Sequence, residues 1–385
     1  MDLISMLKRE DFFPLFFATV KKYYQEALGW SVSMEFAPSK KQANMVIKPH
    51  LSAVTSANMS SKARSFFYAE WNIRNSWMKN IIAKTYVFAM TRTGKQFSQY
   101  QFTFSPQNRV SNDVVIAPNN RSIRFFDYEK NIVGCMIKQG FTSKYFDNQL
   151  RFRIANHYEF MLPLVAYGAD WFQEPILQGH PLVRVTDKKQ HEQGIADALA
   201  DIAVLANDTL HYEDTRQYVS SIAEHIRTLT REAVDRKHIQ TSQVIDRIVD
   251  DFLAEELALT RIPVCQSHGD FQGGNIWVDT AGKTWLYDWE TVGQRSVWYD
   301  ASVLLYSLRR DYGWGEFKAE KEPIRILNCD PQKQYAQKEF DYIKKIILLE
   351  DIVFYLEDML ELPSDWGNEL FDAFAERIQS LTYNS

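Results

Sequence analysis

Residues 265 to 279 read CQSHGDFQGGNIWVD and place three polar side chains between two strand-like apolar runs. These side chains are His268, Asp270 and Asn275, and three glycines lie among them. Glycine permits tight turns, so we expect a loop in which Asp270 and Asn275 face one cleft. Loops that connect regular elements commonly carry binding and catalytic residues. This loop is therefore the first candidate for a functional site.

A second acidic side chain follows the next predicted strand. Residues 284 to 287 are strand-like, and Asp288 comes directly after them. Transfer of a phosphoryl group needs a carboxylate that orients the attacking hydroxyl and accepts its proton, together with oxygen ligands for Mg²⁺. One amide and one carboxylate are sufficient protein ligands, because the substrate phosphates complete the coordination of the metal. Asp270, Asn275 and Asp288 supply these groups.

The two loops resemble those of a known enzyme family. The segments HGDFQGGNIWV (268–278) and LYDWE (286–290) look like the catalytic and metal-binding loops of the aminoglycoside phosphotransferase and choline kinase family. The related protein kinases have the pattern H-R-D-x-x-x-x-N in the corresponding loop. Gly269 stands where protein kinases usually have arginine, which favours the small-molecule branch.

The resemblance implies a role for each polar residue of the two loops. Asp270 is expected to be the catalytic base, and Asn275 and Asp288 are expected to be the metal ligands. His268 would support the loop, and Asp300 would brace it by hydrogen bonding. The cofactors implied are ATP and Mg²⁺. The activity implied is transfer of the γ-phosphate to a hydroxyl group of a small aminoglycoside-like, choline-like or sugar-like acceptor.

The order of the predicted elements agrees with this family. Residues 113 to 178 contain closely spaced strands and a helix at 145–157, whereas residues 179 to 385 are mainly helical. We therefore expect an α+β, protein-kinase-like bilobal fold, with a small antiparallel nucleotide-binding lobe and a helical lobe for catalysis and substrate binding. Residues 1 to 112 would form an additional mixed α/β module of unknown role.

Candidate phosphate-binding residues lie in the predicted small lobe. Lys138 follows the third strand of this lobe, where the family places its phosphate-binding lysine; a surface lysine is the alternative. The turn at 118–122 occupies the place of the phosphate-covering loop and offers Ser122 as a donor. An ordinary hairpin turn is the other interpretation of this segment.

The segment 173–177 resembles the hinge of this family, where backbone groups near Glu174 and Ile176 would meet adenine. In related kinases a helix glutamate pairs with the lysine. The helix expected at 145–157 contains no glutamate, and Asp147 or Gln149 could take its place.

Charge is unevenly distributed along the chain. The net charge is −5, but residues 1 to 112 carry 15 lysines and arginines against 6 acids, which leaves −14 for the remainder. A basic module can dock on its acidic neighbour or hold an anionic partner. Aromatic and basic residues at 64–79 suit nucleic-acid stacking, although their helical spacing favours a core stripe. In the same module, 85–91 and 97–104 predict a β-hairpin.

The sequence also indicates the cellular compartment of the protein. The three cysteines lie far apart without metal-ligand spacing, which fits a reducing environment. Lys8 and Arg9 interrupt the apolar stretch that a signal peptide needs, and no apolar run approaches the ~18 residues of a membrane span. We therefore expect a cytoplasmic protein without a membrane span, and the pattern leaves its oligomeric state open.

Two other functions fit parts of the pattern. A protein kinase would use the same loop chemistry and could dock its protein substrate through the basic module. A non-catalytic nucleotide-binding scaffold would explain the missing helix glutamate and the absence of glycine from the turn at 118–122.

Overall fold

The computed structural model describes the chain in two compact units. Unit 1 comprises residues 1–157 and 162–178, and unit 2 comprises residues 158–161 and 179–385. The described residues are all of these except 1–2, 4–5, 8–10, 49–50, 71–76, 99, 110, 237, 311–312, 320–335, 362–370, 372, 375 and 379–385.

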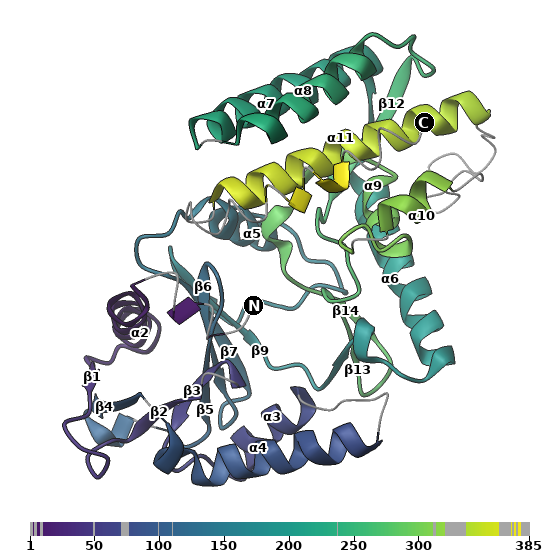
Figure 1. Cartoon of the computed structure of the whole chain (residues 1–385). Coiled ribbons are helices and arrows are strands. Elements are labelled where there is room, and N and C mark those ends of the chain that lie inside the picture. Colours follow the sequence, from purple (N-terminus) through teal and green to yellow (C-terminus); the bar gives the residue numbers. More distant parts are fainter. Residues whose placement is uncertain are drawn as a thin grey trace. The chain divides into compact units, whose positions relative to one another are not determined.

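An antiparallel sheet of nine strands forms the centre of unit 1 (Figure 1). The strand order is β1-β4-β2-β3-β5-β6-β7-β9-β8. The strands are β1 (Ser33–Phe36), β2 (Met45–Lys48), β3 (Ala53–Ser56), β4 (Gln101–Ser105), β5 (Val114–Pro118), β6 (Ser122–Asp127), β7 (Ile132–Ile137), β8 (Ala166–Tyr167) and β9 (Trp171–Pro175).

The sheet continues across the boundary that the sequence suggested between residues 112 and 113. β3 pairs with β5, so that Val54 lies opposite Ile116. This pairing satisfies the edge of β5, which would otherwise expose unpaired backbone groups. Residues 1–112 therefore complete the sheet of the following segment, which corrects the expectation of a separate N-terminal module.

Helices cover both faces of the sheet. On one face, α2 (Phe12–Leu28) packs on Phe125 of β6. The other face meets α3 (Ser61–Glu70), α4 (Trp77–Phe97) and α5 (Lys144–Ala155). Successive residues of a strand point to opposite faces, so Phe125 contacts Tyr23 of α2 while Phe126 contacts Phe66 of α3.

The first half of the predicted hairpin is wrong, because residues 85–91 belong to α4. Their β-branched and aromatic side chains favour a strand locally, but Ala83, Val87 and Thr91 recur every four residues and are all buried. Burial of this helical stripe outweighs the local preference. Of the second half, residues 101–104 lie in the strand β4, which pairs with β1 and β2, whereas Phe97 ends α4.

The aromatic stripe at 64–79 contributes to the core of unit 1. Phe67 is fully buried, and the ring of Phe66 lies 5.0 Å from that of Phe126. These rings therefore support the sheet, as the core-stripe interpretation predicts. Trp71 and Arg74 of the same stripe lie outside the described residues.

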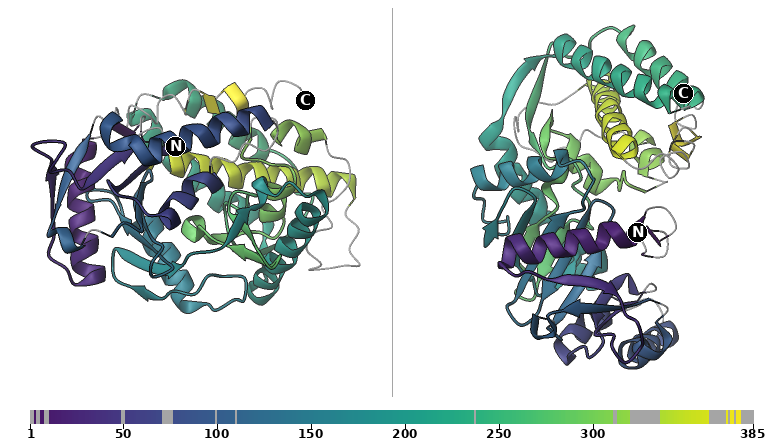
Figure 2. Two further views of the ribbon diagram at one scale, coloured as in Figure 1. Left: turned by 90° about the horizontal axis from the view of Figure 1, so that it is seen from below. Right: turned by 90° about the vertical axis from the view of Figure 1, so that its left-hand side faces the viewer.

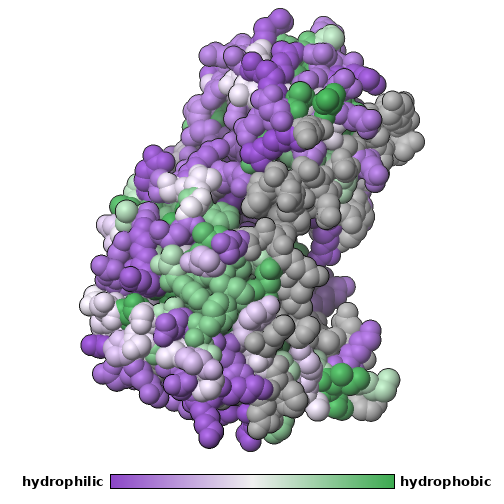
Figure 3. Space-filling view, turned by 60° about the vertical axis from the view of Figure 1, so that its left-hand side comes forward, coloured by the Kyte–Doolittle hydropathy of each residue, from purple (hydrophilic) through white to green (hydrophobic). Residues whose placement is uncertain are grey.

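A hydrophobic area lies over α2 on the face that Figure 3 shows. On this helix, the rings of Phe13 and Phe17 lie 4.9 and 5.6 Å from the ring of Phe36 of β1. Phe36 of β1 is 51% exposed, so this cluster is only partly covered by the described residues.

Close packing between α2 and β7 depends on a glycine. The ring of Tyr23 stacks on Phe125 at 3.9 Å, and its hydroxyl accepts a hydrogen bond from Gln173 of β9. A Cβ atom on Gly134 of β7 would lie 1.8 Å from the Tyr23 oxygen. Only glycine leaves room for the ring at this position.

We expect Gly134→Ala to lower the stability of the protein by about 1–3 kcal/mol or more, because the added methyl group overpacks this contact. Chemical denaturation followed by tyrosine and tryptophan fluorescence measures the change. Gly315→Ala is the control, since no atom lies within 4 Å of its added Cβ. Equal stability of the two variants would refute the packing argument.

Unit 2 is mainly helical and contains two small sheets. Its helices are α6 (Lys188–Thr209), α7 (Thr215–Asp235), α8 (Ile239–Leu253), α9 (Tyr299–Leu305), α10 (Gly313–Ala319) and α11 (Gln337–Glu361). One sheet has the order β10 (Gly179–Pro181), β13 (Ile276–Asp279), β14 (Thr284–Leu286), and the other has β11 (His211–Asp214), β12 (Arg261–Ser267), β15 (Gly293–Ser296). Short 3-10 turns lie at Leu182–Arg184 and Trp289–Thr291.

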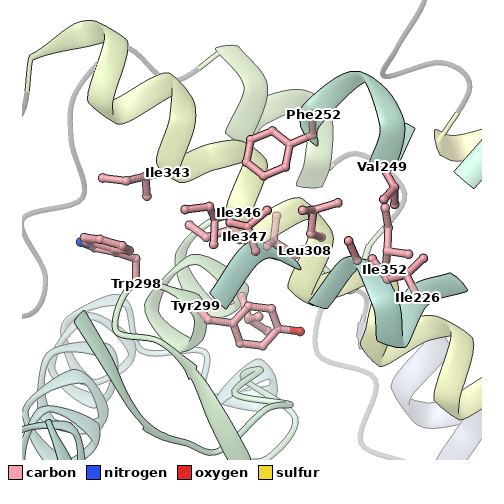
Figure 4. Packing of buried hydrophobic residues seen from close by; sticks show 14 of the residues in the cluster. Ile226, Val249, Phe252, Trp298, Tyr299, Leu308, Ile343, Ile346, Ile347 and Ile352 are labelled. Atoms are coloured by element: carbon pink, nitrogen blue, oxygen red, sulfur yellow. The ribbon is translucent and has the colours of Figure 1, made fainter. Parts of the chain in front are cut away.

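The core of unit 2 forms where α7, α8 and α11 pack together (Figures 1 and 2). Ile226 of α7, Val249 of α8 and Ile352 of α11 meet there, and Tyr299 of α9 lies beside them (Figure 4). The apolar stripes of these helices supply the core, as their periodicity predicts. The predicted α+β class, with a sheet-rich part followed by a mainly helical part, is confirmed. Among the described helices, none is both long and apolar enough to cross a membrane.

Candidate active site

The sheet formed by β10, β13 and β14 holds together the loop between β12 and β13 and the end of β14. Ile276 pairs with Leu286 in this sheet, and the next step of the ladder is a hydrogen bond from the Tyr287 N–H to the Asn275 carbonyl (3.2 Å). Asn275 therefore lies opposite Tyr287, the residue before Asp288. Strand pairing thus brings together the backbones that carry two predicted metal ligands.

Asp270 and Asn275 are in direct contact. The Asn275 Nδ2 group donates to the Asp270 carboxylate (2.8 Å) and to its backbone carbonyl (2.9 Å). With its amide nitrogen used in this way, Asn275 retains its Oδ1 atom as an acceptor for a cation. The sequence predicts that these two side chains face one cleft, and in the structure they are hydrogen-bonded neighbours.

The Asp270 carboxylate accepts several hydrogen bonds. Its Oδ2 atom accepts from Gln272 (2.9 Å) as well as from Asn275, and its Oδ1 atom accepts from Arg309 Nε (2.9 Å). Burial alone would raise the pKa of Asp270, but the positive charge of Arg309 and the hydrogen bonds hold it below the ordinary value of an aspartate. Asp270 therefore remains ionised at neutral pH.

The backbone of the loop is braced by Asp300, the first acidic residue of α9. Its carboxylate accepts from the His268 N–H (2.7 Å), the Gly269 N–H (3.0 Å) and the Ser267 hydroxyl (2.8 Å). His268 is fully buried and its Nε2 lies 3.0 Å from the Tyr287 carbonyl. These contacts match the supporting roles that the resemblance implies for Asp300 and His268.

Gly269 is required by the shape of the loop. Its φ angle is +85°, in the region that side chains disfavour, and an added Cβ would lie 2.3 Å from the Thr291 carbonyl oxygen. The Thr291 hydroxyl in turn donates to the His268 carbonyl (3.2 Å). Glycine at this position therefore permits close packing against the turn that follows Asp288.

Asp288 follows β14 in a left-handed backbone conformation, with φ 68° and ψ 55°. Few residues other than glycine adopt this conformation without cost, and such positions are concentrated at functional sites. The side chain of the next residue, Trp289, is fully buried, and its ring lies 4.5 Å from the His268 ring. Trp289 thus anchors the turn that carries Asp288 against the loop that carries Asp270.

Arg309 is a member of the site that the sequence did not predict. Besides Asp270, it donates to the Gly269 carbonyl (2.9 Å) and the Tyr299 hydroxyl (3.0 Å), and it forms an ion pair with Asp351. Its guanidinium carbon lies 3.8 Å from the centre of the Phe354 ring. No motif marks this arginine, because its partners come from α9, α11 and a loop about forty residues earlier.

Two neighbouring acids of α11 fix this helix to the rest of unit 2. Asp351 accepts from Tyr299 and from the Trp314 ring nitrogen, each at 3.0 Å, in addition to Arg309. Glu350 accepts from the hydroxyl of Ser296 (2.7 Å) and from Tyr218. Burial raises the pKa of Glu350 despite these hydrogen bonds. Arg309 contacts both Asp351 and Asp270, and so links α11 to the candidate base.

The predicted phosphate-binding residues lie close together in unit 1. Ser122 pairs with Ile137 across β6 and β7, and the Lys138 N–H donates to the Arg121 carbonyl (2.8 Å). Lys138 therefore lies beside the turn at 118–122, as expected. Its side chain is 2% exposed, and its Nζ atom lies 3.7 Å from the sulfur of Met6.

The two proposed substitutes for the helix glutamate have other surroundings. Asp147 accepts a hydrogen bond from Ser143 (2.7 Å), at the start of the same helix, and Gln149 is buried. The acid of the predicted hinge, Glu174, instead forms an ion pair with Arg153 of α5 (2.7 Å). The N–H of Ile176 donates to the Asn131 carbonyl (3.1 Å), so this backbone donor is already used.

Comparison with protein families identifies the segment that contains both loops. Residues 167–322 match the model of the phosphotransferase enzyme family. The chain carries a phosphotransferase-family domain. The enzyme class predicted from the two loops, a phosphotransferase with an alcohol group as acceptor, is thereby confirmed.

Several solved structures are similar to this phosphotransferase, all at low identity. A thermostable mutant of the aminoglycoside phosphotransferase APH(4)-Ia shares 14% identity with a TM-score of 0.39, over 70% of this chain and 95% of its own. Ethanolamine kinase from Plasmodium vivax shares 11% identity with a TM-score of 0.47, and the match covers 79% of this chain and 90% of that enzyme. Choline kinase from Cryptosporidium parvum Iowa II shares 11% identity with a TM-score of 0.44, and the match covers 73% of this chain and 93% of that enzyme. No curated protein sequence matches the chain.

Proposed function

We propose that this phosphotransferase uses ATP and Mg²⁺ to transfer the γ-phosphate to a hydroxyl group of a small molecule, with Asp270 as the catalytic base. The observation that carries the proposal is the contact between Asp270 and Asn275, made beside Asp288 by the pairing of β13 and β14. A carboxylate base next to an amide and a second carboxylate is the set of groups that phosphoryl transfer requires.

The residues present suit a hard cation. Asn275 Oδ1 and the Asp288 carboxylate would hold Mg²⁺ together with oxygens of the nucleotide, since oxygen donors are the ligands that Mg²⁺ prefers. When bound, Mg²⁺ neutralises charge on the phosphates. The hydrogen bond from the Asn275 amide to Asp270 orients the amide, so the same interaction positions both the base and the ligand.

Asp270 has the capacity to receive the acceptor hydroxyl. A carboxylate has about four lone-pair sites, and Oδ1 accepts one side-chain hydrogen bond, from Arg309, whereas Oδ2 accepts two. The second site on Oδ1 is proposed to bind the hydroxyl and to orient its oxygen toward the phosphate. The lowered pKa of Asp270 keeps it in the ionised form that this role needs.

The acceptor is proposed to be cationic or rich in hydroxyl groups. Residues 113–385 carry a formal charge of −14, which favours amines over anions. A panel of hygromycin B, choline, ethanolamine and simple sugars, tested with ATP labelled at its γ-phosphate, distinguishes these classes. Transfer to a protein substrate, with none to any small molecule, would identify a protein kinase instead. ATP binding without transfer to any acceptor would identify a scaffold.

Lys138 is proposed to hold the phosphates of ATP. We expect Lys138→Met to weaken ATP binding about tenfold or more, because a charge-assisted hydrogen bond to phosphate is lost. Isothermal titration calorimetry measures the dissociation constant. Lys62→Met, which removes an exposed lysine from α3, is the control and is expected to bind ATP like the wild type. If both variants bind ATP equally well, Lys138 has no part in the nucleotide site.

A further inference from the structure

Unit 1 contains a cavity that the phosphotransferase reaction does not explain. Its volume is about 310 Å³, and it lies beside α2 on the face of the sheet that this helix covers. Protein interiors have few voids larger than a water molecule, whereas pockets for small molecules begin at about 300 Å³. The size therefore suits a small ligand.

The cavity is separate from the predicted phosphate-binding turn. Ile132 and Asp127, which pair with each other at one end of β6 and β7, line the cavity. Ser122 and Ile137 pair at the opposite end of the same two strands, next to Lys138. Five residues of extended strand span about 17 Å. A ligand in the cavity would therefore not touch Lys138.

Aromatic side chains form much of the wall. Tyr23 and Phe125 are stacked with their rings 8° from parallel, and Tyr24 packs against Phe125 with its ring centre at 6.3 Å. Trp30, which follows the left-handed end of α2, adds a half-buried indole. Flat apolar groups bind such surfaces by stacking and edge contacts. The wall thus fits a ligand with a flat apolar body.

Two cationic side chains, Arg109 and Lys130, line the cavity. The guanidinium carbon of Arg109 lies 4.2 Å from the centre of the Trp30 ring, and among the described residues no carboxylate forms an ion pair with it. Lys130, which also lies over Trp30, is paired with Asp127 (3.6 Å). Of these two lining cations, Arg109 is the one available to an anionic group.

Two further features restrict the charge and the hydrogen-bonding groups of a ligand for this cavity. Glu129 lines the same cavity and would repel a molecule of high negative charge. Tyr23 accepts a hydrogen bond from Gln173, and both residues line the cavity. Burial raises the pKa of Tyr23, so its hydroxyl keeps its proton and can donate to a ligand. A single negative charge and an acceptor group are compatible with these residues.

We propose that this cavity binds a small molecule with a flat apolar body and one anionic group, stacked among the aromatic rings and paired with Arg109. The site is independent of the residues proposed for phosphoryl transfer. The probe for it is 1-anilinonaphthalene-8-sulfonate, whose fluorescence rises in an apolar site. N-phenyl-1-naphthylamine, which has the same rings without the sulfonate, is the neutral comparison.

The wild type is expected to bind one equivalent of the sulfonate probe saturably, and Arg109→Gln to weaken it about tenfold while leaving the neutral probe unchanged. Arg92→Gln is the matched control, because Arg92 also lies over an aromatic ring, at 4.6 Å from Phe88, but does not line the cavity. Ser111→Trp, at a residue lining the cavity, is expected to remove binding of both probes.

Competition separates this site from the nucleotide site. Saturating ATP with Mg²⁺ is expected to leave the affinity for the sulfonate probe unchanged. Displacement of the probe by ATP would overturn the proposal, as would equal binding by Arg109→Gln and Arg92→Gln. Several weak, unsaturable binding events that Ser111→Trp does not remove would also overturn it, since they would show adsorption to exposed apolar surface.

Discussion

Asp270→Asn is expected to reduce phosphoryl transfer by about 10²–10⁴-fold, the usual contribution of a positioned general base. Asparagine cannot accept the proton of the attacking hydroxyl. It also places an amide group where the carboxylate now accepts hydrogen bonds from Arg309, Gln272 and Asn275. Turnover with the best acceptor of the panel, measured with labelled ATP, gives the change.

Two further measurements make this result specific. ATP binding and a cooperative unfolding transition are expected to persist in Asp270→Asn, since the aromatic and apolar core of unit 2 is unaffected. Asp279→Asn is the control, because Asp279 is an aspartate at the other end of β13 that accepts hydrogen bonds within its own turn. Near-normal turnover by Asp270→Asn would show that the base is another residue.

Arg309→Met is expected to lower the free energy of unfolding by about 3–5 kcal/mol, because the substitution leaves Asp351 as a buried charge without its main partner. The Asp351 side chain is 1% exposed and that of Arg309 is 9% exposed. Arg310→Met is the control, since this neighbouring arginine is exposed. Urea denaturation measures both variants. A loss of unfolding free energy no larger than that of Arg310→Met would show that Arg309 does not stabilise the buried charge of Asp351.

The same variant changes the response to pH. Arg309 holds the pKa of Asp270 below its unfolded value, so the stabilisation from their pairing is present above that unfolded pKa and is lost as the pH falls through the folded one. Without Arg309 the pKa of Asp270 rises. The acidic limb of the pH–rate profile is therefore expected to move to higher pH in Arg309→Met. An unchanged acidic limb would show that Arg309 does not control the pKa of Asp270.

The arrangement of the candidate site's two loops could be predicted from the sequence, because it depends on local spacing. Asp270 and Asn275 share one loop, and Asp288 follows the next strand, so a single hairpin determines where they lie. The brace from Asp300, downstream of both loops, is expected only because the family resemblance implies that role. Lys138 likewise lies at the end of β7, beside the turn at 118–122, because antiparallel pairing of neighbouring strands fixes that register.

Long-range contacts explain what the sequence did not predict. Arg309, in the turn after α9, meets Asp351 of α11 only because these segments pack in one core, and neither residue has a recognisable spacing to the loop. The N-terminal segment merges with the following strands because β3 covers the edge of β5, a pairing across about sixty residues. Residues 85–91 have strand-like composition, yet the buried stripe of Ala83, Val87 and Thr91 makes them helical.

The most direct test of the central claim is the affinity for ATP with and without Mg²⁺, measured by calorimetry for the wild type and for Asp288→Asn. Asn275 and Asp288 are proposed to hold the cation with the phosphates, so Mg²⁺ is expected to tighten ATP binding about tenfold or more in the wild type. Asp288→Asn is expected to lose this gain while retaining its affinity for ATP alone. An equal effect of Mg²⁺ on both proteins would contradict the account.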